Sequence, residues 1–168
     1  DAAGTVSLWQ TQGTEASTAE LISELPGDVT SQAELDGETY FIAGPVLTPM
    51  LWKLTADGVE WITFLPRLAS NLTNVGDRLA FSARDFGVYG LGPSLWVSDG
   101  TADGTRMVVD LTPVQPGTIS NLAHTANGIV FTVRNDDALV EGLVDYSLWI
   151  SNGFADGTYP LISSNGGD

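Results

Sequence analysis

Hydrophobic residues in this chain occur in short runs that are separated by glycine, proline, asparagine and aspartate. The runs are about four to eight residues long and rich in β-branched and aromatic side chains, as in "RLAFSA" at 78–83 and "IVFTV" at 129–133. No segment keeps the period of about 3.6 residues that an amphipathic helix requires. The pattern therefore predicts an all-β chain of short strands joined by tight turns.

Two kinds of segment recur in a fixed order, which indicates an internal repeat. "SLWVSDGTADGT" at 94–105 aligns without a gap on 7–18 and on 147–158, and a shortened copy lies at 50–65. "SNLTNVGDRLAFSARD" at 70–85 aligns without a gap on 120–135, and a weaker copy lies at 31–44. The Leu-Trp pairs of the first segment place Trp9, Trp52, Trp96 and Trp149 at spacings of 43, 44 and 53 residues.

Each repeat is expected to contain four strands, which we call a to d. Strand a is the "SNLT" segment, strand b is "RLAFSA" or "IVFTV", strand c is "SLWVS" and strand d is "TRMVVDL". Strand d stops near a proline, at Pro26, Pro66 or Pro113. Four antiparallel strands in about 45 residues have the size and order of a β-propeller blade.

The strand count predicts a single repeat domain over 1–168 with about three and a half blades. A half blade is expected at 5–26, and whole blades at 29–66, 68–113 and 118–163. Free-standing propellers have about four to eight blades. Three interpretations stay open: a piece of a longer array, a partial propeller completed by another subunit, or an open arc. Bare blade edges favour association with a partner or with a second copy.

The two Gly-Thr pairs of the repeat are expected in the turn between strands c and d. They are Gly100-Thr101 and Gly104-Thr105 in the best copy. Glycine adopts a positive φ at little cost, and a threonine hydroxyl can bond a nearby backbone group. Trp9, Trp52, Trp96 and Trp149 share one repeat position, so we expect them to pack between blades rather than to stack on a sugar.

The chain resembles bacterial repeat arrays that carry a signature of the form "ELWxSDGTxxGT". The resemblance is most specific at 95–105, and it implies a propeller-like fold in an exported protein: extracellular, periplasmic or on the cell surface. This sequence has Ser7, Ser94 and Ser147 where the signature has Glu, and Gln12 and Asn152 where it has Asp. The resemblance implies no catalytic motif.

The connections between strands b and c vary most between repeats, and long divergent loops on a repeated scaffold commonly carry binding sites. They are "GPVLTP" at 44–49, "RDFGVYGLGP" at 84–93 and "RNDDALVEGLVDY" at 134–146. Ordinary solvated loops are the plainer interpretation. The candidate binding residues there are Asp85, Phe86, Tyr89, Asp136, Asp137, Glu141, Asp145 and Tyr146.

The charge of the chain is strongly negative: 21 acidic residues face six basic ones, for a formal net charge of −15. Such a surface repels phosphate backbones and anionic lipid, so we expect no nucleic-acid partner and no membrane insertion. Acidic loops raise the possibility of calcium, with Asp136 and Asp137 as weak candidates and "DGTADG" at 99–104 as a superficial match. Otherwise we expect no cofactor.

Groups suited to catalysis are scarce. The chain has no cysteine, and His124 is its only histidine, which leaves little for zinc sites or for nucleophiles activated by histidine. Two acidic residues could still converge for glycosidic chemistry, but no spacing singles out a pair. The sequon at Asn71–Thr73 coincides with the repeat consensus of strand a, so we interpret it as structural.

We therefore expect a non-catalytic binding or scaffold module of an exported bacterial protein, acting through its b–c loops and open blade ends. The first alternative is a structural subunit that completes its propeller by docking into a larger complex or by self-assembly. The second is a fragment of a polysaccharide-active enzyme.

Overall fold

The chain folds into antiparallel sheets in a computed structural model that describes residues 6–87, 90–111, 117–134 and 146–163. Three sheets have four strands each, and one has two. In every sheet, neighbouring strands are also neighbours in the sequence, so each sheet is a meander. The predicted all-β class and the predicted order of strands a to d are confirmed.

We call the four sheets units 1 to 4 in chain order. Unit 1 contains β1 (Val6–Gln10) and β2 (Ala19–Leu25); unit 2 contains β3 (Val29–Leu35), β4 (Glu38–Ala43), β5 (Met50–Thr55) and β6 (Gly58–Phe64); unit 3 contains β7 (Ser70–Asn74), β8 (Leu79–Gly87), β9 (Gly90–Ser98) and β10 (Arg106–Asp110); unit 4 contains β11 (Thr118–Thr125), β12 (Gly128–Arg134), β13 (Tyr146–Ser151) and β14 (Thr158–Ser163). Short 3₁₀ turns lie at Glu15–Ser17 and Ala155–Gly157.

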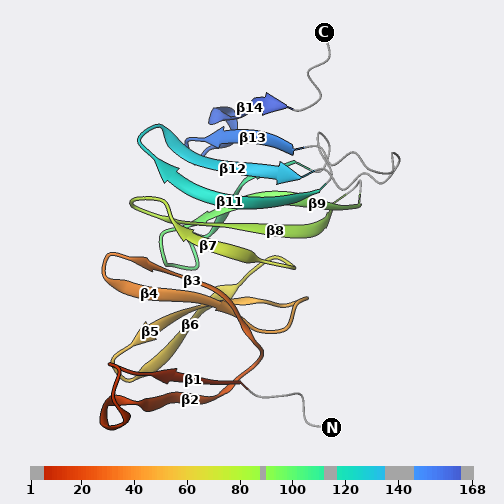
Figure 1. Ribbon diagram of the computed structural model, residues 1–168. Coiled ribbons are helices and arrows are strands. Elements are labelled where there is room, and N and C mark those ends of the chain that lie inside the picture. The colour runs from red at the N-terminus through yellow and green to blue at the C-terminus, as the bar shows by residue number, and fades with distance from the viewer. Residues whose placement is uncertain (1–5, 88–89, 112–116, 135–145, 164–168) are drawn as a thin grey trace.

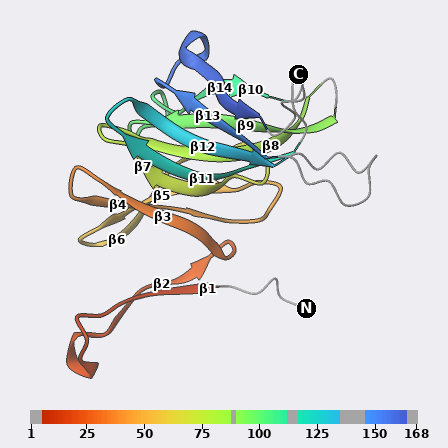
Figure 2. The same ribbon diagram turned by 45° about the horizontal axis from the view of Figure 1, so that its top comes forward.

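The units stack face to face in sequence order, from unit 1 near the N-terminus to unit 4 near the C-terminus (Figure 1). The first strands of units 2, 3 and 4 lie side by side, β3 against β7 and β7 against β11. Side chains connect them: the Asn74 amide donates to the Glu34 carbonyl, and the Asn71 amide donates to the Ile119 carbonyl at 3.2 Å. In the turned view of Figure 2, units 2 to 4 form one stack, and the hairpin of unit 1 projects from it.

Asn71 and Asn121 explain the "SNL" consensus of strand a. Both have a positive φ, 59° and 53°, a conformation that asparagine tolerates better than most residues. Each lies where the pairing with the next strand shifts register. Asn71 donates to the Ser82 hydroxyl at 2.8 Å, and Asn121 donates to the Thr132 hydroxyl at 3.0 Å. The sequon asparagine therefore shapes a bulge in the strand, in line with its structural interpretation.

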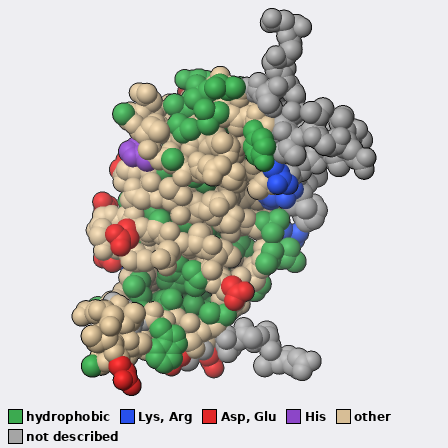
Figure 3. All heavy atoms as spheres, viewed as in Figure 1, with side chains coloured by type: hydrophobic (Ala, Val, Ile, Leu, Met, Phe, Trp, Pro, Cys, Tyr) green, Lys and Arg blue, Asp and Glu red, His purple; other side chains and the backbone are tan. Residues whose placement is uncertain are grey.

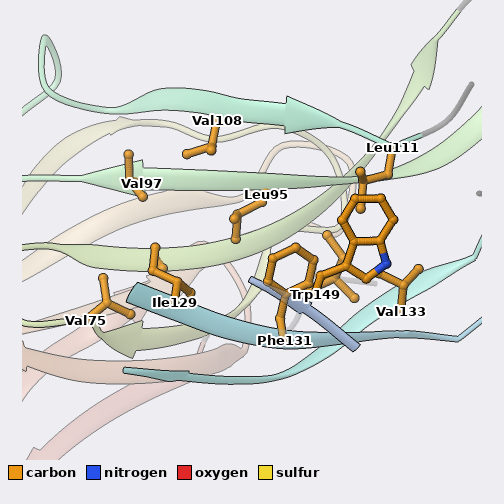
Figure 4. Close-up of a cluster of buried hydrophobic side chains, with 11 residues drawn as sticks. Val75, Leu95, Val97, Val108, Leu111, Ile129, Phe131, Val133 and Trp149 are labelled. Carbon is orange, nitrogen blue, oxygen red and sulfur yellow. The ribbon is translucent and has the colours of Figure 1, made fainter. Parts of the chain in front are cut away.

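Apolar side chains fill each seam between consecutive units. The seam of units 3 and 4 buries Leu95 and Val97 from one sheet against Phe131 and Trp149 from the other (Figure 4). The seam of units 2 and 3 buries a similar set, and a smaller cluster around Leu25 joins units 1 and 2. The core is thus divided into layers between sheets.

The Leu-Trp pair of strand c contributes to two different layers. Successive residues of a strand point to opposite faces of the sheet. In unit 3, Leu95 lies in the core shared with unit 4, whereas Trp96 packs against the core shared with unit 2. The repeated dipeptide therefore directs leucine at the following unit and tryptophan at the preceding one.

Each tryptophan of units 2 to 4 stacks on a phenylalanine of the adjacent strand b. The pairs are Phe41–Trp52, Phe81–Trp96 and Phe131–Trp149, with ring centroids 6.4, 6.1 and 6.2 Å apart. Offset aromatic pairs at this separation are favourable beyond their apolar area.

The segment 84–93 differs from the sequence-based expectation of a loop. β8 and β9 continue through it as a paired hairpin, with Arg84 opposite Pro93 and Gly87 opposite Gly90. Its glycines suggested a loop, but an antiparallel pair that is already aligned over Leu79–Ala83 can extend past its neighbouring strands. Residues 88 and 89 and the side chains of 85–91 lie outside the described part of this hairpin.

Candidate functional site

The Gly-Thr motif builds a hydrogen-bonded turn between strands c and d. In unit 3, the Ser98 hydroxyl accepts from the Gly100 amide at 3.1 Å and bonds the Thr105 hydroxyl at 2.8 Å. The Thr105 hydroxyl also lies 2.6 Å from the Thr101 carbonyl, to which it donates. The Asp99 carboxylate accepts from the backbone and the hydroxyl of Thr101, at 3.0 and 2.6 Å. The polar side chains of Ser98, Asp99, Thr101 and Thr105 thus all have partners inside the turn.

Unit 4 repeats this turn with different side chains. The Ser151 and Thr158 hydroxyls are 2.7 Å apart, and Thr158 donates to the Phe154 carbonyl at 2.7 Å. The Asn152 side-chain oxygen accepts from the Phe154 amide at 2.9 Å, in the position of the Asp99 carboxylate. An uncharged oxygen therefore suffices at this position.

Unit 1 forms the same turn by exchanging two residues. Gln12 replaces the aspartate, and Ser17 replaces the second glycine. The Ser17 hydroxyl accepts from the Thr14 amide at 3.2 Å and bonds the Thr14 hydroxyl at 2.7 Å, which are the two bonds that Asp99 makes in unit 3. The serine thus supplies the polar oxygen from the other side of the turn.

The two glycines of the motif have different roles. Gly100 has a φ of +88°, as expected for a glycine of the turn. Gly104 does not have a positive φ, so the expected conformational role is wrong for it. A methyl group on Gly104 would overlap the Asp99 carboxylate, and one on Gly157 would overlap the Asn152 side chain. The second glycine leaves room for the polar side chain that closes the turn.

The turn of unit 3 occupies the Asp99–Gly104 segment that superficially matches a calcium loop. The bond from the Thr101 hydroxyl is the main reason that the pKa of Asp99 lies below its ordinary value of 3.8; partial burial opposes it, and backbone bonds and Arg78 assist. Within the described ranges, no three His, Asp or Glu side chains come together as a metal site. The other calcium candidates, Asp136 and Asp137, lie outside the described residues.

The described residues leave two sheet faces without a neighbouring unit. We call the outer face of unit 4 the C-terminal end face. Val130 pairs with Ile150, Leu148 pairs with Ile162, and Ile150 pairs with Tyr159, so all five side chains lie on this face. The corresponding residues of unit 3 include Ala80, Leu95 and Val97, which are fully buried against unit 4. Figure 3 shows hydrophobic side chains gathered over this end of the molecule.

The opposite, N-terminal end face belongs to unit 1 and presents Trp9. Leu8 points at unit 2, so its strand neighbour Trp9 points away from it, together with Glu20, which pairs with Trp9. Trp9 is 57% exposed, whereas Trp149 is 8% exposed. The expected packing of Trp9 between blades is therefore wrong for the chain as it stands: no unit precedes unit 1 in the described residues, and no strand-b phenylalanine adjoins this tryptophan.

The predicted loop residues are only partly placed. Tyr146 begins β13 opposite Arg134 and is exposed. Asp85 and Phe86 belong to β8, but their side chains lie outside the described part of the structure. The remaining candidates also lie outside it: Tyr89, Asp136, Asp137, Glu141 and Asp145.

Cavities lie between units at both edges of the stack. One, of about 380 Å³, lies between units 2 and 3 and is lined by Tyr40 and Gly100 among others. Two others lie at opposite edges. The first, of about 300 Å³, is at the edge of the c–d turns, and it is lined by Arg78, His124 and Phe154 among others. The second, of about 260 Å³, is at the edge of the b–c connections, beside Val46 and Arg84. We call the second edge the loop edge; it comprises 44–49, 65–69, 84–87 and 90–93. Sequence reasoning missed Arg84, because only the folded chain shows what surrounds it.

No family model matches the chain, and no curated protein sequence matches it. Helices long and apolar enough to cross a membrane are absent from the described residues.

Proposed function

We propose that this chain is a non-catalytic scaffold module, an open arc of propeller-type blades that assembles by stacking its end faces head to tail with a second copy. This combines the open blade ends and the self-assembly expected from the sequence. The observation that supports it most directly is the pair of end faces that no other unit of the described residues covers.

The two end faces carry the two different sides of the repeated sheet that meet in every internal seam. Every internal seam joins the leucine side of one unit to the tryptophan side of the next. The C-terminal end face carries the leucine side, with Leu148, and the N-terminal end face carries the tryptophan side, with Trp9. If these two faces packed together, Leu148 of one copy and Trp9 of the other would take the places of Leu95 and Trp149 in the seam of units 3 and 4. Burying apolar side chains that now face solvent supplies the driving force, at about 25 cal/mol per Å².

This mode of contact is heterologous, because different surfaces meet on the two copies. Such contacts give rings when the rotation closes and open filaments when it does not. Unit 1 has two strands instead of four, so the contact is smaller than an internal seam, and we expect a weak, concentration-dependent association.

Sedimentation velocity over a dilution series tests the proposal. We expect the mass to rise with concentration and to fall to the monomer in Ile162→Asp, which charges the C-terminal end face at a side chain that is 64% exposed. Leu47→Asp is the matched control, since Leu47 is 61% exposed but lies on the loop edge. A wild-type monomer at all concentrations, or equal association of Ile162→Asp and Leu47→Asp, contradicts the proposal.

A further inference from the structure

The cavity at the loop edge has mainly apolar walls. It opens on the seam between units 2 and 3, and its volume is about 260 Å³. Its apolar lining comes from Val46, Pro49, Leu68 and Ala69. This volume is slightly below the usual range for drug-sized ligands, so the cavity suits a molecule of few heavy atoms.

One charged side chain reaches this cavity. Arg84 lines it, and its Nε is the buried side-chain nitrogen that has no hydrogen-bond partner among the described residues. A buried donor without a partner is destabilising, and a guanidinium lowers its free energy most by binding an anionic oxygen. The cavity therefore combines an apolar wall with an unused donor of positive charge.

The backbone beside Arg84 is held in an unusual conformation. Leu68 has a φ of 56°, which is uncommon for a branched apolar residue. Its amide donates to the Val46 carbonyl at 3.0 Å, and the Arg84 amide donates to the Arg67 carbonyl at 3.0 Å. These two bonds fix the connection between β6 and β7 against both neighbouring elements. Such strained positions are often associated with ligand-binding sites.

We propose that this cavity binds a small monocarboxylate with an apolar tail. The carboxylate accepts from the guanidinium of Arg84, and a small rotation of this side chain turns its buried, unpartnered Nε toward the cavity. The tail lies against Val46 and Leu68. A monocarboxylate fits better than a phosphate for two reasons. The walls are apolar, and the chain carries a net charge of −15, which repels a dianion more strongly than a monoanion.

This inference does not depend on the end-face assembly. The cavity lies on an internal seam, so a monomer holds the complete site. Loss of carboxylate binding and loss of self-association are separate outcomes, which are measured on different surfaces.

A titration of the ¹⁵N-labelled chain with hexanoate, followed by amide NMR shifts, tests the site. We expect shifts centred on Leu68, Ser70 and Arg84, with a dissociation constant on the order of 1 mM, which is a reasonable affinity for so few atoms. Hexanamide has the same tail without the charge and should bind at least about tenfold more weakly. Hexanoate tests whether the site binds a free carboxylic acid. A dipeptide with a C-terminal leucine tests whether it binds the carboxylate at the end of a polypeptide.

Variants distinguish binding by the Arg84 guanidinium from a general effect of the net charge of the chain. Arg84→Gln should lose hexanoate binding, and Arg84→Lys should weaken it several-fold, because lysine cannot present the planar fork. Arg78→Gln is the matched control: it removes the same charge at the opposite edge and should bind as the wild type does. Equal binding of hexanamide, unchanged binding by Arg84→Lys, or no saturable shifts in the wild type would each overturn the proposal and leave water as the partner of Nε.

Discussion

Leu95 and Trp96 are consecutive residues of one strand, yet they pack in two different cores. Leu95 is fully buried between units 3 and 4, and Trp96 lies against the core of units 2 and 3. The Trp96 indole donates to the Ser94 hydroxyl at 3.0 Å, and Trp149 donates to Ser147 at 2.8 Å in the same way. In unit 3, the three-residue motif Ser-Leu-Trp therefore joins the sheet to both of its neighbours.

Truncating the leucine should have different effects in two copies of the motif. Leu95→Ala removes a fully buried side chain and should lower the free energy of unfolding by about 3 kcal/mol. Leu148→Ala makes the same change on the half-buried C-terminal end face and should cost about 1 kcal/mol. Urea unfolding of the monomeric protein measures both. Equal losses would show that the two leucines have equivalent surroundings, contrary to the stacking described above.

The first glycine of the turn can be tested in two surroundings. Gly13 and Gly100 have nearly the same φ, +91° and +88°. A methyl group on Gly13 meets no atom within 4 Å, whereas one on Gly100 overlaps the Tyr40 hydroxyl of unit 2. Gly13→Ala should therefore cost about 1 kcal/mol for the backbone alone, and Gly100→Ala clearly more. Thermal unfolding compares them, and a larger loss in Gly13→Ala would contradict this assignment of the steric contact.

Exchanging two residues should convert the turn of unit 3 into that of unit 1. Gly104→Ser alone crowds the Asp99 carboxylate, and Asp99→Gln alone removes the acceptor of the two Thr101 bonds, so each should destabilise the protein. Together they recreate the Gln12 and Ser17 arrangement. A double-mutant cycle should give a favourable coupling of about 1 kcal/mol. Simple additivity of the two single changes would show that Ser17 does not replace the aspartate.

Asp99 should also give the turn a dependence on pH. Its pKa is lowered in the folded protein, mainly by the Thr101 hydroxyl, so its stabilising effect is complete above 3.8 and is lost as the pH falls through the lower folded value. Asp99→Asn keeps the acceptor oxygen, as Asn152 does, but cannot titrate. We expect the wild type to exceed Asp99→Asn in unfolding free energy near pH 6, and the difference to shrink below pH 3.8. A difference that stays constant over this range would exclude a titrating Asp99 as its cause.

The strand meander was predictable from the sequence because the repeat places Leu-Trp, Gly-Thr and "SNL" at fixed distances. The longer β8–β9 hairpin was not, since a glycine-rich segment such as 84–93 has the composition of a loop and its pairing depends on the strands that precede it. The opposite directions of Leu95 and Trp96 follow from strand geometry once the stacking order is known. The hydrophobic pattern within one strand does not predict the order in which the units stack.

The candidate site was less predictable than the fold. The signature favours glutamate before Leu-Trp, so Ser94 looked like a simple departure, yet it accepts the Trp96 indole hydrogen. The exposure of Trp9 depends on which units are present, since Ser7-Leu8-Trp9 has the same three residues as Ser147-Leu148-Trp149, in which the tryptophan is buried. Arg84 becomes notable only because the surrounding segments of units 2 and 3 leave its Nε without a partner.

The head-to-tail contact is tested most directly by disulfide cross-linking, because the chain has no cysteine of its own. Glu20→Cys places a thiol beside Trp9 on the N-terminal end face, and Tyr159→Cys places one on the C-terminal end face. When equal amounts of the two variants are mixed and oxidised, we predict that the mixed dimer forms well above its statistical share. A statistical mixture of dimers, or dimers that join two identical faces, would contradict head-to-tail stacking.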